Sequence, residues 1–116
     1  MTREFIMTPE FDKNWSKLGF TDDDLKKLQE EILLNPKIGP VIEGTGGLRK
    51  MRFALNTGKS GGARVLYVDF VVLEEVYLIT AFPKSDKVNI NSAEKNQIQK
   101  MIKELKQSAK ERRSKK

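Results

Sequence analysis

Three runs of residues in the second half of the chain alternate between apolar and other side chains, and only short loops separate them. The runs cover residues 48–55, 63–72 and 76–82, and Pro83 ends the third because proline has no N–H to give to a neighbouring strand. Alternation with a period of two is typical of β-strands, whose successive side chains point to opposite faces. Strands joined by short loops pair as antiparallel neighbours. The pattern therefore predicts an antiparallel meander, which the rest of the chain must cover.

The residues before the meander predict a short strand over 3–7 and a pair of helices. The first helix is expected from Thr8 to Gly19 and the second from Thr21 to Asn35. Each threonine is a favourable N-cap, because its hydroxyl can accept a hydrogen bond from a free N–H of the first turn. Since only a short break separates the two helices, they are expected to form a hairpin.

A long helix is expected after the meander. Asn91, with Glu94 three residues later, predicts its start, and apolar residues recur at helical spacing as far as Ala109. The expected order β-α-α-β-β-β-α describes a single α+β domain over residues 1–109. We expect the helices on one face of a small, mostly antiparallel sheet, with the other face left for function. Residues 110–116 form a basic tail that is expected to fray unless a partner holds it.

The composition excludes several classes of function. The chain has 116 residues with no cysteine and no histidine, which rules out disulfide scaffolds, zinc fingers, thiol nucleophiles and histidine acid–base chemistry. No apolar run approaches the roughly 18–20 residues that span a bilayer. The mixture of Arg3 and Glu4 in the first residues argues against a secretory signal. Any acid–base group of an enzyme must therefore be Lys, Arg, Tyr, Asp or Glu.

The positive charge is concentrated in two segments. The chain carries 22 basic and 16 acidic side chains, a formal net charge of +6. Residues 48–64 hold five of the cations and no acid, and residues 100–116 hold eight cations and two acids. Two cationic segments on an otherwise balanced chain favour a polyanionic partner. For the second segment, a solvent-exposed helix end without a partner is an equally good explanation of the charge.

Four cations are candidates for one site. Lys50 and Arg52 stand two residues apart on a predicted strand, so their side chains point the same way, about 6.5–7 Å apart. Arg64 opens the next strand and Lys84 follows the last one, so the ends of the meander can gather all four. Close cations without a carboxylate partner repel one another unless a phosphate neutralises them. The alternative is that they are scattered charges, which protect strand edges from aggregation.

Such a cluster can cleave RNA without a metal or a histidine. The 2′-hydroxyl of the substrate attacks the adjacent phosphorus, and the protein must accept a proton, stabilise the transition-state charge and assist the leaving 5′-oxygen. Arginine holds phosphate oxygens in pairs. A lysine crowded by other cations has a lowered pKa and can act as a base. No cofactor and no metal are expected for this chemistry.

The residues around the cluster resemble the HigB branch of the RelE-type toxins of bacterial toxin–antitoxin modules. The resemblance rests on GTGGLRKMR (44–52), KSGGARVLY (59–67) and YLITAFPK (77–84), and it covers about residues 3–107. It implies the same fold and a ribosome-dependent endonuclease that cuts translated mRNA in the decoding site. It also implies a cytoplasmic protein that contacts the ribosome, its ribosomal RNA and mRNA. The resemblance further implies a HigA-like helix-turn-helix antitoxin as the protein partner. The chain is then expected to contact operator DNA only through this antitoxin, and no contact with a membrane is implied.

The resemblance gives the four cations roles by position. Lys50 and Arg52 match the basic pair after the glycine-rich turn, and Arg64 matches the arginine that opens the next strand. Lys84 occupies the basic position after the last strand. Either lysine is then the base or proton donor, and the two arginines hold the scissile phosphate.

Three further residues are expected to bind substrate: Arg49, Lys59 and Phe82. Phe82 stands where many relatives carry a tyrosine, and its ring can stack on a base but cannot transfer a proton. Tyr67 is the nearby phenol, and its strand parity favours a place in the core.

Two other functions are open at this point. A ParE-like relative shares the fold but inhibits DNA gyrase without cutting RNA, and such relatives usually lack the convergent cations. A non-catalytic RNA-binding module would use the basic residues only to follow backbone phosphates. If the chain is a nuclease, the basic tail over 110–116 is expected to add affinity for ribosomal RNA and no chemistry.

Overall fold

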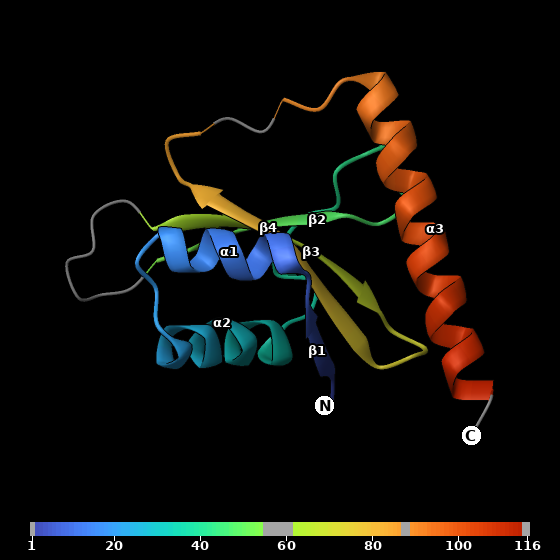
Figure 1. Ribbon diagram of the computed structural model, residues 1–116, viewed down its shortest axis with the longest axis horizontal. Helices are drawn as coiled ribbons and strands as arrows, with labels where there is room; N and C mark the ends of the chain where they lie inside the picture. The colour runs from blue at the N-terminus through green and yellow to red at the C-terminus, as the bar shows by residue number, and fades with distance from the viewer. Residues whose placement is uncertain (1, 55–61, 87–88, 115–116) are drawn as a thin grey trace.

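The computed structural model describes residues 2–54, 62–86 and 89–114, and it shows the expected order of elements (Figure 1). The predicted α+β class is confirmed. The end of the first strand of the meander, at residue 55, and most of the loop after it lie outside the described residues. In chain order the elements are β1 (Glu4–Met7), α1 (Pro9–Lys17), α2 (Asp22–Leu34), β2 (Arg49–Phe53), β3 (Ala63–Phe70), β4 (Glu75–Pro83) and α3 (Ser92–Ser114).

A four-stranded sheet organises the molecule, with its strands in the order β1-β4-β3-β2. β2, β3 and β4 form the predicted antiparallel meander. β1 adds to the outer edge of β4 as a parallel strand, with Met7 beside Leu78 at its end. On the opposite edge, Val41 forms an isolated bridge with Arg49. β3 and β4 are therefore the inner strands of the sheet.

Helices cover both faces of the sheet, so the expectation that they would share one face was wrong. α1 and α2 lie against one face and α3 lies against the other (Figure 1). The reason is in β3, whose alternate residues are apolar on both sides, as in strands that are buried on two faces. Val65 and Tyr67 belong to the core beneath α1 and α2, whereas Leu66 and Val68 belong to the core beneath α3.

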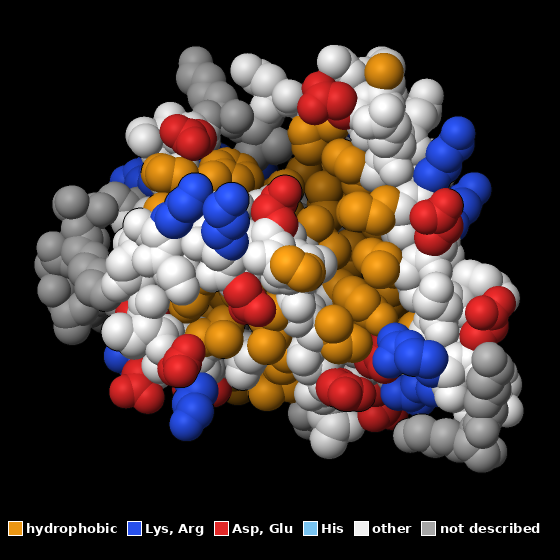
Figure 2. Space-filling model, viewed as in Figure 1, with side chains coloured by type: hydrophobic (Ala, Val, Ile, Leu, Met, Phe, Trp, Pro, Cys, Tyr) orange, Lys and Arg blue, Asp and Glu red, His pale blue; other side chains and the backbone are white. Residues whose placement is uncertain are grey.

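The two cores differ in how completely they are closed. Aromatic rings fill the first core, with Trp15 stacked on Phe20 at a centroid distance of 4.5 Å. The second core lies against α3, whose Ile102 and Ala109 are buried, and several of its other apolar residues are only partly covered. Figure 2 shows hydrophobic side chains gathered in a strip between the sheet and α3. No helix in the described part of the chain combines the length and the apolar character that crossing a membrane requires.

The first two helices are capped as predicted. Thr8 Oγ1 accepts a hydrogen bond of 3.1 Å from the N–H of Phe11 and donates one of 2.7 Å to the carbonyl oxygen of Ile79. Thr21 and Asp24 form a reciprocal capping box. The second bond of Thr8 fixes the start of α1 on β4, so the helix runs towards the far end of that strand.

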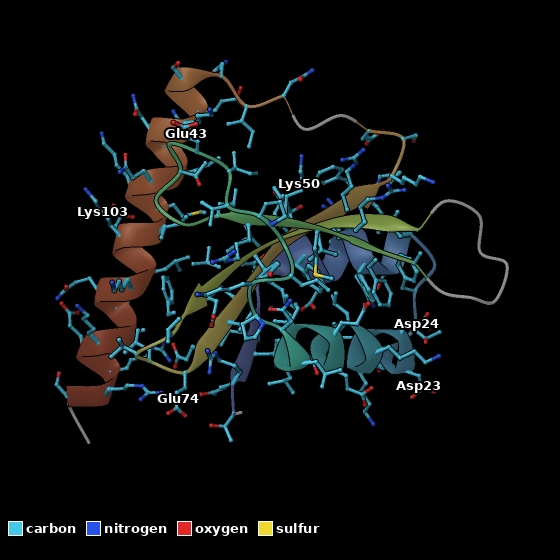
Figure 3. All side chains as sticks on the ribbon, turned by 180° about the vertical axis from the view of Figure 1, so that it is seen from behind. Asp23, Asp24, Glu43, Lys50, Glu74 and Lys103 are labelled. Atoms are coloured by element: carbon cyan, nitrogen blue, oxygen red, sulfur yellow. The ribbon has the colours of Figure 1, made fainter. Side chains whose placement is uncertain are left out.

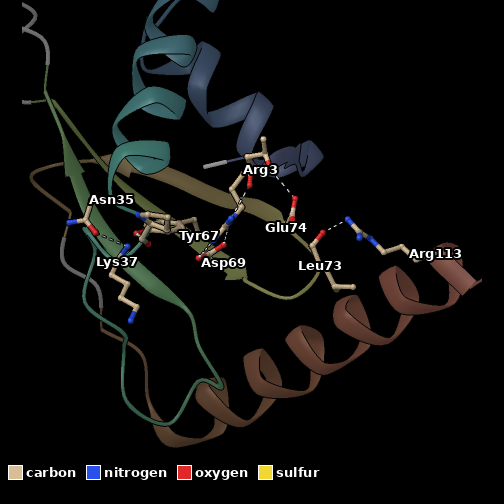
Figure 4. Close-up of polar contacts among 10 residues, drawn as sticks. Arg3, Asn35, Lys37, Tyr67, Asp69, Leu73, Glu74 and Arg113 are labelled. Atoms are coloured by element: carbon tan, nitrogen blue, oxygen red, sulfur yellow. Dashed lines mark hydrogen bonds and ion pairs between the residues drawn. The ribbon is translucent and has the colours of Figure 1, made fainter.

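The last turns of α3 are held to the sheet, whereas the sequence predicted a frayed tail. α3 continues to Ser114. Arg112 Nη2 donates a hydrogen bond of 2.8 Å to Tyr77 Oη, and Arg113 donates one to the carbonyl oxygen of Leu73 (Figure 4). The partners are 35 and 40 positions apart in the chain. Helical periodicity carries no information about such distant contacts.

Tyr67 ties the loop before β2 to the centre of the sheet. Its side chain is fully buried, as its parity predicted, and burial raises the pKa of the phenol. Its Oη accepts a hydrogen bond of 3.0 Å from the N–H of Gly39 and donates one of 2.8 Å to the carbonyl oxygen of Pro36. The loop then lies directly against β2, where the N–H of Lys50 donates to the carbonyl oxygen of Pro40 at 3.1 Å. Tyr67 thereby supports the backbone of Lys50.

Replacing Tyr67 with phenylalanine is expected to lower the free energy of unfolding by about 1–3 kcal/mol, because a buried N–H and a buried carbonyl oxygen lose their partner. Urea unfolding at neutral pH measures the change. Tyr77→Phe is the matched control, and it is expected to cost less because its partner Arg112 is exposed. Equal stability of Tyr67→Phe and the wild type would contradict this role of the hydroxyl.

Candidate functional site

Two arginines face each other across the pair β2 and β3. Arg52 and Arg64 are direct register partners, so their Cβ atoms stand about 4.5–5.5 Å apart. Like charges in this arrangement destabilise a sheet. Between described residues, the ion pairs are one of Arg3 and one of Arg112, and neither involves the facing arginines. Arg64 lies near one end of the sheet, because it is the second residue of β3.

Lys50 stands on the same face as Arg52, two residues earlier on β2. Its register partner is Leu66, and its side chain is half-buried. Figure 3 shows Lys50 on β2, across the sheet from α2. The loop that contains Gly39 packs against the backbone of Lys50 at the edge of the sheet. It is so close that a Cβ atom on Gly39 would lie only 2.6 Å from the carbonyl oxygen of Lys50. Only glycine allows that approach.

β4 completes the row of residues. Phe82 is the register partner of Arg64 on the other side of β3, and its side chain is half-buried. Arg64 Nε donates a hydrogen bond of 3.2 Å to the carbonyl oxygen of Lys84, in the turn after β4. The structure thus places Arg52, Arg64 and the backbone of Lys84 at one end of the sheet, with Lys50 two residues along β2 on the same face as Arg52. We call these four residues the basic cluster.

The structure does not bring Arg49 to the basic cluster. Arg49 is out of phase with Lys50 and Arg52 along β2, and its Nη1 donates a hydrogen bond of 2.8 Å to the carbonyl oxygen of Gly39. Lys59, the other basic residue predicted to bind substrate, lies outside the described residues.

Both phenols of the chain lie in the hydrophobic cores. Tyr67 belongs to the first core and Tyr77 to the second, where Arg112 donates to it. Burial raises the pKa of both hydroxyls. The groups that the basic cluster itself offers for proton transfer are therefore the ammonium groups of Lys50 and Lys84.

The basic cluster has the chemistry of an anion site. Guanidinium groups present planar sets of N–H donors that match the oxygens of a phosphate, and an ammonium adds a mobile donor. An anion between the facing arginines would offset their repulsion. Among the residues that the structure describes, no three carboxylates are arranged to hold a metal ion.

Comparisons with known proteins identify the family of the chain. The family model described as the RelE toxin of the RelE/RelB toxin–antitoxin system matches residues 5–115. The chain belongs to the RelE toxin family.

Two solved structures of RelE from E. coli are similar to this RelE-family chain. One is a mutant of the toxin in the free state, in which two arginines are replaced by alanine. It is 25% identical, with a TM-score of 0.55 over 73% of this chain and 86% of that chain. The other is the intact RelBE toxin–antitoxin complex. It is 25% identical, with a TM-score of 0.54 over 74% of this chain and 100% of that chain. The RelE-type resemblance is confirmed, and the HigB branch stays a prediction.

Sequence reasoning missed two parts of the surroundings of this RelE-family site. One is the support of Lys50 by Gly39 and Pro40, which the sequence shows only as a turn-forming pair in a loop. The other is Asn14 of α1, whose Nδ2 donates a hydrogen bond of 3.0 Å to Thr80 Oγ1 near the end of β4. In the sequence, Asn14 is one polar residue of an amphipathic helix, and no local signal distinguishes it.

Replacing Arg52 with glutamine is expected to raise the free energy of unfolding by about 0.2–1 kcal/mol at low salt, because one of two facing charges is removed. The gain should shrink at high salt, where the repulsion is screened. Urea unfolding at two ionic strengths measures both effects. Lys26→Gln on α2 is the matched control, and it should not stabilise because acidic residues precede Lys26 in the first turn. A loss of stability in Arg52→Gln at low salt would argue against the repulsion.

Proposed function

We propose that this RelE-family chain is a ribosome-dependent endoribonuclease of the HigB branch, which cuts translated mRNA. The observation that carries the proposal is the facing pair of Arg52 and Arg64. Lys50 and Lys84 flank this pair, and no ion pair between described residues neutralises the set. In this proposal the toxin domain includes α3 to its end at Ser114. No cofactor or metal takes part, and the chain acts in the cytoplasm on translating ribosomes.

The proposed reaction uses the substrate's own nucleophile. The 2′-oxygen bonds to phosphorus while the bond from phosphorus to the 5′-oxygen breaks, which leaves a 2′,3′-cyclic phosphate and a 5′-hydroxyl. A base accepts the 2′-hydroxyl proton, and an acid gives a proton to the 5′-oxygen. Lys50 and Lys84 share these two tasks because a guanidinium stays protonated in proteins. Arg52 and Arg64 hold the phosphate oxygens and stabilise the charge of the transition state.

The spacing of the strands supports this division of roles. Neighbouring strands lie about 4.7–4.9 Å apart, so the row from Arg52 through Arg64 to Phe82 spans two such steps. That width suits one phosphate with a sugar on either side. Phe82 at the end of the row offers a ring for stacking on a base.

We propose an antitoxin as the protein partner. The support is the family match and the similarity to the E. coli RelBE toxin–antitoxin complex. If the chain is of the HigB branch, the antitoxin is a HigA-like helix-turn-helix protein, and operator DNA is reached only through it.

Replacing Arg64 with alanine is expected to abolish growth arrest, because the phosphate loses its central guanidinium. The purified variant should unfold at a temperature close to that of the wild type and should still bind antitoxin. Lys26→Ala on α2 is the matched control and should remain toxic. Full toxicity of Arg64→Ala would place the chemistry elsewhere.

Primer extension on mRNA from cells expressing the chain separates the three functions that the sequence left open. Cuts within translated codons support the proposed nuclease. A DNA-damage response without cuts would favour a gyrase inhibitor, and RNA binding with neither effect would favour a non-catalytic module.

We also propose that the basic end of α3 adds affinity for ribosomal RNA and takes no part in the chemistry. Removing residues 110–116 is a poor test because Arg112 and Arg113 hold the helix to the sheet. Lys110→Glu is a better one, since Lys110 is exposed. The expected result is weaker co-sedimentation with ribosomes, with an unchanged cleavage rate at saturating ribosome concentration. Reduced cleavage with unchanged ribosome binding would contradict the assignment.

A further inference from the structure

A cavity of about 380 Å³ opens beside the basic cluster, at the edge of β4. β1 ends at Met7, opposite Leu78, so the rest of β4 has a strand neighbour only on the side of β3. The end of α1 lies beside this part of β4 (Figure 1). The cavity between them is lined by Asn14, Lys17, Leu18, Ala81, Phe82, Pro83 and Asp86.

The cavity adjoins the basic cluster at one residue, although none of the four basic residues lines it. Phe82 lines the cavity and is also the register partner of Arg64. Arg64 is bonded to the carbonyl oxygen of Lys84, two residues before Asp86, which also lines the cavity. Only Phe82 therefore separates Arg64 from the cavity. We expect the base of the nucleotide next to an Arg64-bound phosphate to reach the opening of the cavity.

The walls of the cavity combine flat apolar surface with hydrogen-bond acceptors. Phe82 and Pro83 supply apolar surface of the kind on which unstacked bases rest. Asn14 is fixed by its bond from Nδ2 to Thr80 Oγ1, and no hydrogen bond within the described residues uses its side-chain oxygen, Oδ1. The carboxylate of Asp86 is a second acceptor, and Lys17 adds a positive charge at the rim.

We propose that this cavity binds the base of the nucleotide next to the scissile phosphate, and that it favours a base with an exocyclic amino group over uracil. The inference rests on the proposed nuclease function. Adenine, cytosine and guanine can donate an amino hydrogen to the acceptors Asn14 and Asp86, whereas uracil carries carbonyl oxygens in the place of an amino group. Asn14 is half-buried and Asp86 is exposed, so a base without an amino group loses hydrogen bonds here and binds more weakly. The cavity therefore sets a preference for which codons are cut.

The first test is the binding of non-cleavable RNA. Two 2′-O-methyl trinucleotides that differ only in adenine or uracil at the centre are titrated into the full chain and followed by NMR. The adenine form is expected to bind about tenfold more tightly and to shift the side-chain amide of Asn14. Asn14→Leu and Asp86→Ala should each remove most of the difference, while Asn96→Leu, an exposed change on α3, should keep it. Equal affinities for the two RNAs in the wild type would overturn the inference.

The second test is the base preference at the cut sites, read from the 5′ ends of cleaved mRNA in cells. Wild-type cuts should favour an amino-bearing base at one fixed position beside the cut, and Asn14→Leu should reduce that preference about tenfold while cutting continues. An unchanged base profile, with or without a loss of antitoxin binding, would overturn the inference. If the trinucleotides are discriminated but the wild type makes no cuts, the base site stands and the proposed nuclease function fails.

Discussion

The burial of β3 on both faces is the constraint on which the rest of the structure depends. Val65 and Tyr67 require cover from α1 and α2, while Leu66 and Val68 require cover from α3. This double cover fixes the register of the neighbouring strands, because a slip would take apolar residues away from their partners. The same register places Arg64 opposite Arg52. The hydrophobic cores therefore hold two like charges together, which the local electrostatics disfavour.

The two facing arginines thus lower the local stability of the sheet, and the packing of the two hydrophobic cores compensates for this cost. Tyr67 supports Lys50 through the loop at Gly39, and the bond from Arg64 to Lys84 fixes a guanidinium over the end of β4. These supports come from residues that take no direct part in the proposed chemistry. The arrangement is what a phosphate-binding site needs, because donors that are already in position lose little entropy when the anion arrives.

Much of the fold could be predicted from the sequence because the relevant signals are local. The caps at Thr8 and Thr21 depend on neighbours within one turn, and the parity of Lys50 and Arg52 follows from strand geometry alone. The side of the sheet that α3 covers could not be predicted, since an apolar stripe shows which face of a helix is buried and not against what. The attachment of the end of α3 to the sheet could not be predicted either, because the hydrogen-bond partner of Arg112 is distant in the sequence.

The candidate site also contains some residues that local sequence signals could predict and others that only the folded chain reveals. Strand parity predicted that Lys50 and Arg52 share a face, and the structure shows that Arg52 and Arg64 are direct register partners. Arg49 was expected to bind substrate, although its own parity directs it to Gly39. Asn14 could not be connected with the site, since only the folded chain brings α1 beside the end of β4.

The most direct measurement is a structure of the chain with a non-cleavable RNA dinucleotide. If the account is right, the bridging phosphate lies between the guanidinium groups of Arg52 and Arg64, with oxygens at hydrogen-bond distance from both. A phosphate bound along α3 instead, with the two arginines untouched by RNA, would contradict it.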